Sequence, residues 1–249
     1  MDKSSVKHIP LEEQQKAWTQ WHATTTMGNA RAQREWVEVE AFLRSLHRPD
    51  LRILEIGCGT GWLSERLVEF GSVTALDLSE ETIRNNRDRV PTVTFLSGDF
   101  FEMPLPVGAF DVVVSQHVLS HVEDQPLFIA RMADLMADDG YGVIATQNRP
   151  VLERWDRIPG PQPGQLRHWL SASELRRVLK PHFPMIRIGS VLPSGEDGYL
   201  RVVNSVRLNA ALSYLVPKDR IERAKEDLLL GQTLIAVVSK GAPLPPKTT

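Results

Sequence analysis

The sequence has only one cysteine, Cys58, among its 249 residues. A single thiol cannot form an internal disulfide and has no partners for a zinc cluster, which favours a reducing compartment. No stretch approaches the run of about 18 apolar residues that a membrane-spanning helix needs. Residues 1–15, MDKSSVKHIPLEEQQ, lack the apolar core of a signal peptide. We therefore expect a cytoplasmic protein.

An excess of charge of one sign is also missing. The 29 Lys and Arg residues nearly balance the 31 Asp and Glu residues, and the net charge is −2. This balance gives no electrostatic reason to expect a polyanionic partner. We expect a small-molecule substrate, with no nucleic acid and no membrane as partner, and the oligomeric state stays open.

Helical and strand patterns alternate along the chain. Apolar residues repeat with helical spacing over 11–22 and 33–46, and N-cap residues predict further helices from Ser79, Asp124 and Ser171. Strands are expected from the apolar segments LRILEIG, SVTALDL, TVTFLSGD, FDVVVSQ, YGVIATQN, MIRIGSVL and TLIAVVSK. This alternation predicts the α/β class, as a Rossmann-like seven-stranded, mainly parallel sheet with helices on both faces.

We expect the whole chain, 1–249, to form one domain. Within it we predict an N-terminal helical cap at 10–48 and a cofactor-binding core at 50–150. Residues 151–249 should supply a lid, the last strands and an insertion on the substrate side. Only the tail GAPLPPKTT has the composition of a flexible end.

A glycine-rich loop follows the first core strand in LEIGCGTG, residues 54–61. Ligands of open α/β sheets bind beyond the carboxyl ends of the strands, where glycines let a ligand lie against the backbone. The dinucleotide fingerprint needs a further small residue where this chain has Trp62, and no phosphate-binding G-x-x-x-x-G-K-[ST] motif is present. A nicotinamide oxidoreductase is therefore disfavoured.

Four motifs in order resemble those of the class I S-adenosylmethionine-dependent methyltransferases. They are LEIGCGTG, the acidic residue ending VTALDLS, the GDF segment, and FDVVVSQHVLSHVED, and together they run from about Ile53 to Asn148. Within this family, the sequence is similar to the small-molecule methyltransferases of the ubiquinone-biosynthesis type. The resemblance implies S-adenosylmethionine as cofactor, with S-adenosylhomocysteine as product.

The resemblance also implies a set of cofactor-binding residues. Asp77 would accept hydrogen bonds from the ribose hydroxyls, Asp99 would accept from the adenine amino group, and Leu78 and Phe100 would flank the ring. The amino-acid tail would be held by Glu55 or by the loop amides. The full predicted set is Glu55, Gly57, Cys58, Gly59, Gly61, Asp77, Leu78, Asp99, Phe100 and Ser115. The alternatives are that the two aspartates cap turns and that Phe100 is a core residue.

The sulfonium of the cofactor is a good leaving group, so a general base is needed only for a poorly ionised acceptor. The candidate bases are His117 and His121 after the fourth predicted strand, and His168 in the lid-like stretch. The alternative for each is a neutral histidine with local hydrogen bonds. Magnesium-dependent relatives place carboxylates beyond the fourth and fifth strands, where this chain has neutral residues, so no metal is expected.

Aromatic side chains in the variable segments are the candidate acceptor contacts. They are Trp18, Trp21, Trp155, Trp169 and Tyr199. We expect methyl transfer to a small molecule by direct in-line displacement, with oxygen as the first choice of acceptor atom and nitrogen as the second. The alternative to an enzyme is a non-catalytic partner subunit that binds adenosylmethionine without transferring its methyl group.

Overall fold

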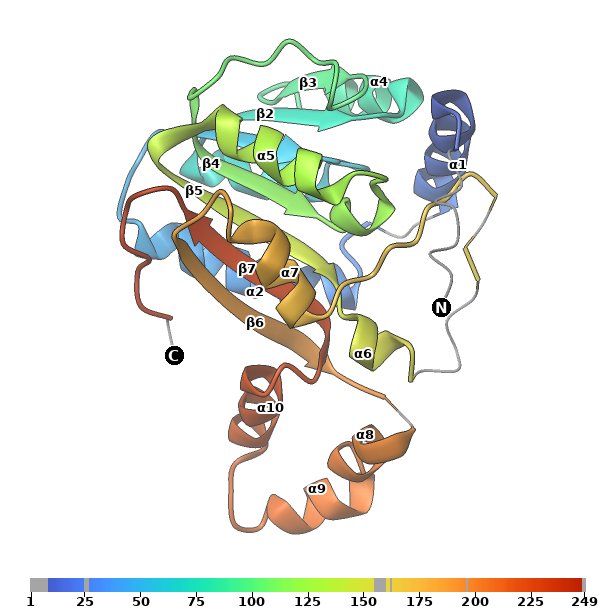
Figure 1. Cartoon of the computed structure of the whole chain (residues 1–249), viewed down its shortest axis with the longest axis vertical. Helices are drawn as coiled ribbons and strands as arrows, with labels where there is room; N and C mark the ends of the chain where they lie inside the picture. Colours follow the sequence, from blue (N-terminus) through green and yellow to red (C-terminus); the bar gives the residue numbers. More distant parts are fainter. Residues whose placement is uncertain (1–8, 25–26, 155–159, 162, 196, 248–249) are drawn as a thin grey trace.

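A seven-stranded sheet forms the centre of the protein, in the order β3-β2-β1-β4-β5-β7-β6 (Figure 1). The computed structural model describes residues 9–24, 27–154, 160–161, 163–195 and 197–247. β7 pairs antiparallel with β5 and β6, and the other pairs are parallel. The strands are β1 (Leu51–Ile56), β2 (Gly71–Asp77), β3 (Thr94–Ser97), β4 (Phe110–Gln116), β5 (Met136–Gln147), β6 (Met185–Pro193) and β7 (Gly231–Ser239). The Rossmann-like α/β fold expected from the sequence is confirmed.

Helices cover both faces of the sheet. One hydrophobic core lies between the sheet and α2, α3 and α4, and the second lies between the sheet and α5 and α7 (Figure 1). The helices are α1 (Leu11–Thr24), α2 (Ala30–Ser45), α3 (Trp62–Leu67), α4 (Glu80–Arg89), α5 (Gln125–Leu135), α6 (Arg149–Leu152), α7 (Ala172–Leu179), α8 (Gly198–Val203), α9 (Val206–Leu212) and α10 (Lys218–Asp227), with 3-10 turns η1 (Val68–Phe70) and η2 (Leu119–His121). The described helices include none that is long and apolar enough to cross a membrane.

The expected N-caps are in place. The side chains of Ser79 and Asp124 accept hydrogen bonds from the backbone of the first turns of α4 and α5. Ser171 and Glu174 form a reciprocal capping box at α7. These local bonds satisfy helix-end amides and fix where each helix begins, immediately after a strand or loop that reaches the carboxyl edge of the sheet.

The two N-terminal helices differ in their relation to the core. α2 buries Val39, Phe42 and Leu43 against the sheet, so it belongs to one of the two helical layers. α1, which is described throughout, buries no residue and lies beside α4 near the carboxyl ends of β1 and β2 (Figure 1). Of the two N-terminal helices, α1 therefore covers the strand ends and α2 does not.

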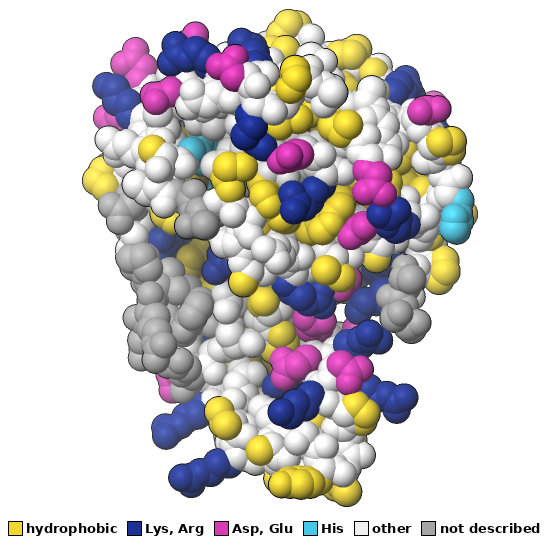
Figure 2. All heavy atoms as spheres, turned by 180° about the vertical axis from the view of Figure 1, so that it is seen from behind, with side chains coloured by type: hydrophobic (Ala, Val, Ile, Leu, Met, Phe, Trp, Pro, Cys, Tyr) yellow, Lys and Arg dark blue, Asp and Glu magenta, His cyan; other side chains and the backbone are white. Residues whose placement is uncertain are grey.

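The insertion between β6 and β7 forms α8, α9 and α10. Helices α8 and α9 project away from the sheet, and α10 returns to pack against β6 (Figure 1). Val206, Tyr214 and Leu215 are more than four-fifths exposed on this projection. Figure 2 shows hydrophobic side chains at this end of the molecule, with Lys and Arg side chains near them. The insertion, which we predicted on the substrate side, thus exposes much of its apolar surface.

The C-terminal tail, which we expected to be flexible, packs against the protein over its described residues, up to Lys247. Ala242 and Leu244 lie against the first hydrophobic core. The Pro243 carbonyl accepts a hydrogen bond from the Tyr141 hydroxyl, and Lys247 forms an ion pair with Asp227 at 2.6 Å. Its Pro-rich composition indicated an absence of helix or strand, but tertiary contacts give it a fixed path.

We predict that Leu244→Ala lowers the free energy of unfolding by about 1 kcal/mol, because Leu244 is partly buried and truncation removes part of its packing. Urea unfolding measures this change. Val107→Ala is the matched control, because Val107 is 78% exposed. Equal midpoints for the two variants would show that the tail does not pack in solution.

Candidate active site

The glycine loop has a backbone that requires glycine. Gly57, Gly59 and Gly61 have φ angles of 75°, 48° and 69°. A Cβ on Gly57 would lie 2.2 Å from the Cγ2 atom of Val118, so the chain after β4 packs directly onto this loop. The amides of Gly57 and Cys58 both donate to the Leu76 carbonyl, which ties the loop to β2. The loop backbone is therefore packed closely at the carboxyl edge of the sheet, with no room for side chains, in the place where ligands of open α/β sheets bind.

Asp77 and Asp99 stand at the ends of neighbouring strands. The Asp77 carboxylate accepts hydrogen bonds from the amides of Gly59 at 2.8 Å and Ser79 at 3.0 Å. The Asp99 carboxylate accepts one from the amide of Phe101. Both aspartates thus hold turns, which was the alternative to a cofactor role. A carboxylate has about four acceptor sites, so these bonds leave room for ligand hydroxyls, and both cofactor roles stay predictions.

The remaining predicted cofactor contacts differ in burial. Leu78 is half-buried beside Asp77. The Phe100 ring packs 5.0 Å from the Phe128 ring in the second core, with the Arg131 guanidinium 5.3 Å away. Ser115 is buried on β4, and its hydroxyl has no hydrogen-bond partner among the described residues. Core packing accounts for the position of Phe100, whereas the unpaired Ser115 hydroxyl is available to a ligand.

Burial controls the ionisation of Glu55 and Cys58, two members of the predicted cofactor-binding set. Burial, with a smaller contribution from Asp77, raises the pKa of Glu55 to about 8 despite a 2.5 Å hydrogen bond from the Ser64 hydroxyl. Burial also raises the pKa of the Cys58 thiol well above its ordinary value. Glu55 is therefore a neutral acid near pH 7, and a cation placed beside it would favour its ionised form.

The helix α1 meets the glycine loop through side chains that the sequence analysis did not single out. The hydroxyls of Thr19 and Ser79 lie 2.8 Å apart, and Nδ1 of His22 lies 3.2 Å from the Thr82 hydroxyl. Nε2 of His22 lies 3.1 Å from where a Cβ on Gly59 would be. No signal in the sequence indicated that Thr19 and His22 of α1 make these contacts, because the contacts depend on the tertiary fold.

The three candidate histidines have different partners. Nε2 of His117 lies 2.9 Å from both carboxylate oxygens of Glu35. Nδ1 of His121 lies 2.6 Å from the Leu166 carbonyl oxygen, and Nδ1 of His168 lies 3.2 Å from the Val122 carbonyl oxygen. Burial lowers the pKa of His121 to about 4. Local hydrogen bonding, the alternative for each residue, is therefore present at all three.

The predicted acceptor contacts fall into separate groups. Trp18 reaches the strand ends, since its ring lies edge-on to His121 at 4.7 Å. Trp21 is half-exposed on α1, and the Trp169 ring lies 4.8 Å from the Arg167 guanidinium. Tyr199 lies on the projecting α8 with its ring 5.5 Å from the Arg154 guanidinium. Trp155 lies outside the described residues, so the structure brings only Trp18 into contact with a candidate base.

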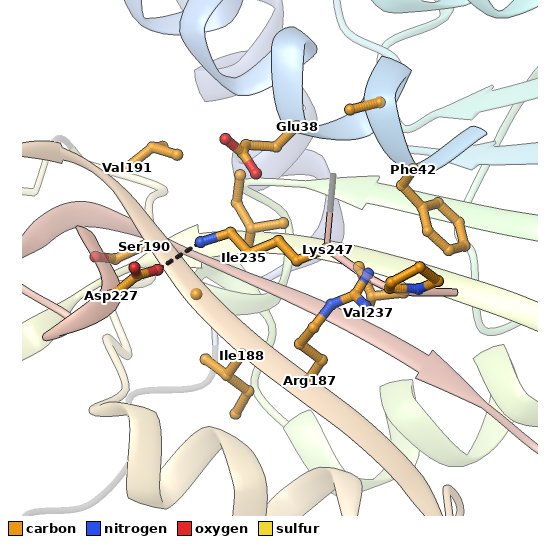
Figure 3. A pocket seen from close by; sticks show the side chains of 13 residues that line it. Glu38, Phe42, Arg187, Ile188, Ser190, Val191, Asp227, Ile235, Val237 and Lys247 are labelled. Atoms are coloured by element: carbon orange, nitrogen blue, oxygen red, sulfur yellow. Dashed lines mark hydrogen bonds and ion pairs between the residues drawn. The ribbon is translucent and has the colours of Figure 1, made fainter. Parts of the chain in front are cut away.

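A cavity of about 130 Å³ lies between α2 and the antiparallel pair of β6 and β7 (Figure 3). Its lining includes Phe42, Arg187, Val237 and the tail residue Lys247, which reaches across to Asp227. None of the residues predicted to bind cofactor or acceptor lines it. This cavity is therefore a gap under the packed tail and not the predicted site.

Comparisons with known proteins agree with this geometry. Residues 54–144 match the family model described as a methyltransferase domain. A probable S-adenosylmethionine-dependent methyltransferase of Mycolicibacterium smegmatis is 34% identical over 129 residues, which are 51% of this chain and 49% of that protein. A ubiquinone biosynthesis O-methyltransferase of Caulobacter is 39% identical over 107 residues, 41% of this chain and 42% of that protein.

Solved structures support the fold. A chain in the complex between the Haloferax volcanii Trm112 methyltransferase activator and a methyltransferase superposes with a TM-score of 0.62 at 16% identity, over 92% of this chain and 98% of that one. Residues 54–144 are similar to a methyltransferase domain, and the Mycolicibacterium relative is named as S-adenosylmethionine-dependent. The sheet order and the strand-end loop agree with this similarity. The chain's matches span about half or less of the length of these curated relatives.

We predict that Glu55 makes the folded protein less stable as the pH rises. Between about pH 4.5 and 8 the unfolded chain releases the Glu55 proton and the folded protein keeps it, so the free energy of unfolding falls across this window. Glu55→Gln removes this dependence. Urea unfolding without added cofactor at pH 5 and pH 8 should show Glu55→Gln gaining stability relative to the wild type at the higher pH.

The control for this experiment is Glu102→Gln, because Glu102 is exposed. It should follow the pH dependence of the wild type. If Glu55→Gln also runs parallel to the wild type, Glu55 is ionised in the folded protein and the argument from burial is wrong.

Proposed function

We propose that this protein transfers the methyl group of S-adenosylmethionine to a hydroxyl oxygen of a small molecule, by direct in-line displacement and without a metal. One observation carries the proposal. The glycine loop, Asp77 and the His117 segment after β4 meet at one edge of the sheet, tied together by the Gly59 amide bond to Asp77 and the contact of Val118 with Gly57.

The residues at this edge fit the cofactor. Asp77 would accept from the ribose hydroxyls, Leu78 would lie along the adenine, and the Glu55 carboxyl would hold the ammonium group of the amino-acid tail. The amides of Gly57, Cys58 and Gly59 already donate within the protein, to the Leu76 carbonyl and the Asp77 carboxylate. The unpaired Ser115 hydroxyl adds a polar group that a ligand could satisfy. The bound cofactor supplies an electrophilic methyl carbon on sulfur, so the protein has to align an acceptor and exclude water.

The covers at this edge favour a small acceptor. α1 contacts the start of α4 through Thr19 and places His22 beside Gly59. The stretch before α7 contacts η2, since the His168 amide donates to the Ser120 carbonyl at 2.7 Å. The Caulobacter relative is named as an O-methyltransferase, which supports oxygen over nitrogen. The residues at the carboxyl ends of β4 and β5, Ser115-Gln116 and Gln147-Asn148, carry no carboxylate, which supports a reaction without a metal. We further propose a cytoplasmic protein with neither nucleic acid nor membrane as partner.

The test is transfer of isotopically labelled methyl from adenosylmethionine into a cellular metabolite extract, followed by mass spectrometry of the product. Asp77→Asn keeps the size of the side chain but removes the charge that accepts from the ribose. We expect it to weaken binding of adenosylhomocysteine about 10-fold or more in calorimetry, since hydrogen bonds to charged groups contribute about 1.5–3 kcal/mol.

Asp88→Asn is the matched control, because Asp88 is exposed on α4. It should bind and react as the wild type does. If the labelled methyl group is found on a nitrogen atom of the product, the acceptor atom is nitrogen and the proposal of oxygen is wrong. Tight binding of adenosylhomocysteine with no labelled product in any extract would favour a non-catalytic binding subunit, and no binding would overturn the proposal.

A further inference from the structure

A charged residue lies on the apolar stripe of α2. Glu35 is only 1% exposed, on the side of the helix that also carries Val39 and Phe42. A buried carboxylate costs free energy unless it is paired and hydrogen-bonded. Its burial therefore calls for an explanation in its partners.

Those partners are the His117 ring and Thr233 on β7. Oε1 of Glu35 accepts a hydrogen bond from the Thr233 hydroxyl at 2.7 Å, and both oxygens lie 2.9 Å from Nε2 of His117. Burial opposes ionisation, but His117 and the hydrogen bonds outweigh it and lower the pKa of the Glu35 carboxyl. A carboxylate accepts only, so Nε2 of His117 carries the proton of this bond.

The backbone of His117 is held in an unusual conformation. Its φ angle is +59°, in the left-handed region that costs a non-glycine residue roughly 1–3 kcal/mol. The His117 amide donates to the Ala145 carbonyl at 2.8 Å, which anchors this turn between β4 and β5. The turn places the ring against α2 while Val118, the next residue, packs on Gly57. His117 is thus fixed one residue before the chain's contact with the glycine loop.

The other ring nitrogen of His117 has no partner. Nδ1 is buried, and no described residue lies within hydrogen-bond distance of it. With the proton held on Nε2 by Glu35, Nδ1 is a lone-pair acceptor. A buried acceptor without a donor is rare in proteins unless a ligand or water supplies one.

We propose that Glu35 is a positioning residue, which orients His117 to act as the general base. The methyl acceptor would then be an un-ionised hydroxyl group, such as that of an alcohol or a phenol. This inference rests on the proposed methyl transfer and deepens it. Nδ1 takes the hydroxyl proton, so that the O–H bond breaks, an N–H bond forms and the electron pair stays on oxygen. Glu35 stabilises the imidazolium that results, and the proton leaves to water after the reaction.

The other two histidines lack this arrangement. His121 and His168 each direct Nδ1 at a carbonyl oxygen, which fixes a tautomer but supplies no full negative charge to stabilise an imidazolium. Burial also makes His121 a weak base, with its pKa lowered to about 4. Among the three candidates in the described chain, His117 alone has a carboxylate partner in contact with its ring.

The first test reads the ring directly and needs no acceptor. Nitrogen-15 NMR of histidine-labelled protein, with and without adenosylhomocysteine, should show His117 above its titration range as the Nε2-protonated tautomer. Glu35→Gln should lose this preference and give a mixture of tautomers, while His117→Gln assigns the signal. Glu38→Gln on the same helix is the control, because Glu38 binds Arg34 and not a histidine.

The second test is a double-mutant cycle on kcat with the acceptor found by labelling. His117→Gln should lower kcat about 100-fold or more, as expected for loss of a general base. Glu35→Gln should lower kcat at least about 10-fold and shift the acid limb of its pH profile, with KM changed less than about 2-fold. The double variant should be no slower than His117→Gln, since the residues act as a unit.

The outcomes separate this inference from the proposed function. A proton on Nδ1 of His117 in the wild type, or additive losses in the cycle, would overturn the role of Glu35 even if methyl transfer is real. If the wild-type protein does not bind adenosylhomocysteine, the proposed function is instead refuted. Unchanged thermal unfolding of Glu35→Gln, alongside the tautomer change, would show that the effect is not a folding defect.

Discussion

The hydrogen bond from the Gly59 amide to the Asp77 carboxylate joins the two parts on which the site depends. It connects the loop after β1 to the end of β2 across the carboxyl edge of the sheet. The same carboxylate also accepts from the Ser79 amide, so it sets the start of α4. Because one side chain fixes the loop and the following helix, the surface predicted to bind the cofactor is organised before any ligand arrives, and such organisation lowers the cost of binding.

Two buried carboxyl groups near this edge illustrate how environment decides ionisation. Glu55 has a single hydroxyl donor and the nearby charge of Asp77, and its pKa is raised to about 8. Glu35 has an imidazole and a hydroxyl donor, and its pKa is lowered. The residue type is the same and both are almost fully buried. The difference comes from their partners: Glu35 has donors on two side chains and the nearby Arg31, whereas Glu55 has one hydroxyl donor and the negative charge of Asp77 beside it.

Local patterns predicted the seven strands, the helix caps and the glycine loop, because each depends on residues close together in the chain. The strand β5 begins at Met136 rather than at Tyr141, and the tail packs although its composition is that of a loop. Both differences arise from pairing with distant segments. The family resemblance supplied the roles of Asp77 and Asp99, which spacing alone left open between cofactor binding and turn capping.

The Glu35 contact shows what a sequence pattern could reveal and what it could not. A glutamate on the stripe that carries Val39 and Phe42 is an irregularity visible in the sequence, and it signals a buried polar partner. Its partners lie 82 and 198 residues away along the chain, at the ends of β4 and β7, and only the fold brings them together. The strands form the edge at which we expect the ligand to bind. Helix α2, packed against them, supplies the Glu35 carboxylate that contacts His117 at this edge.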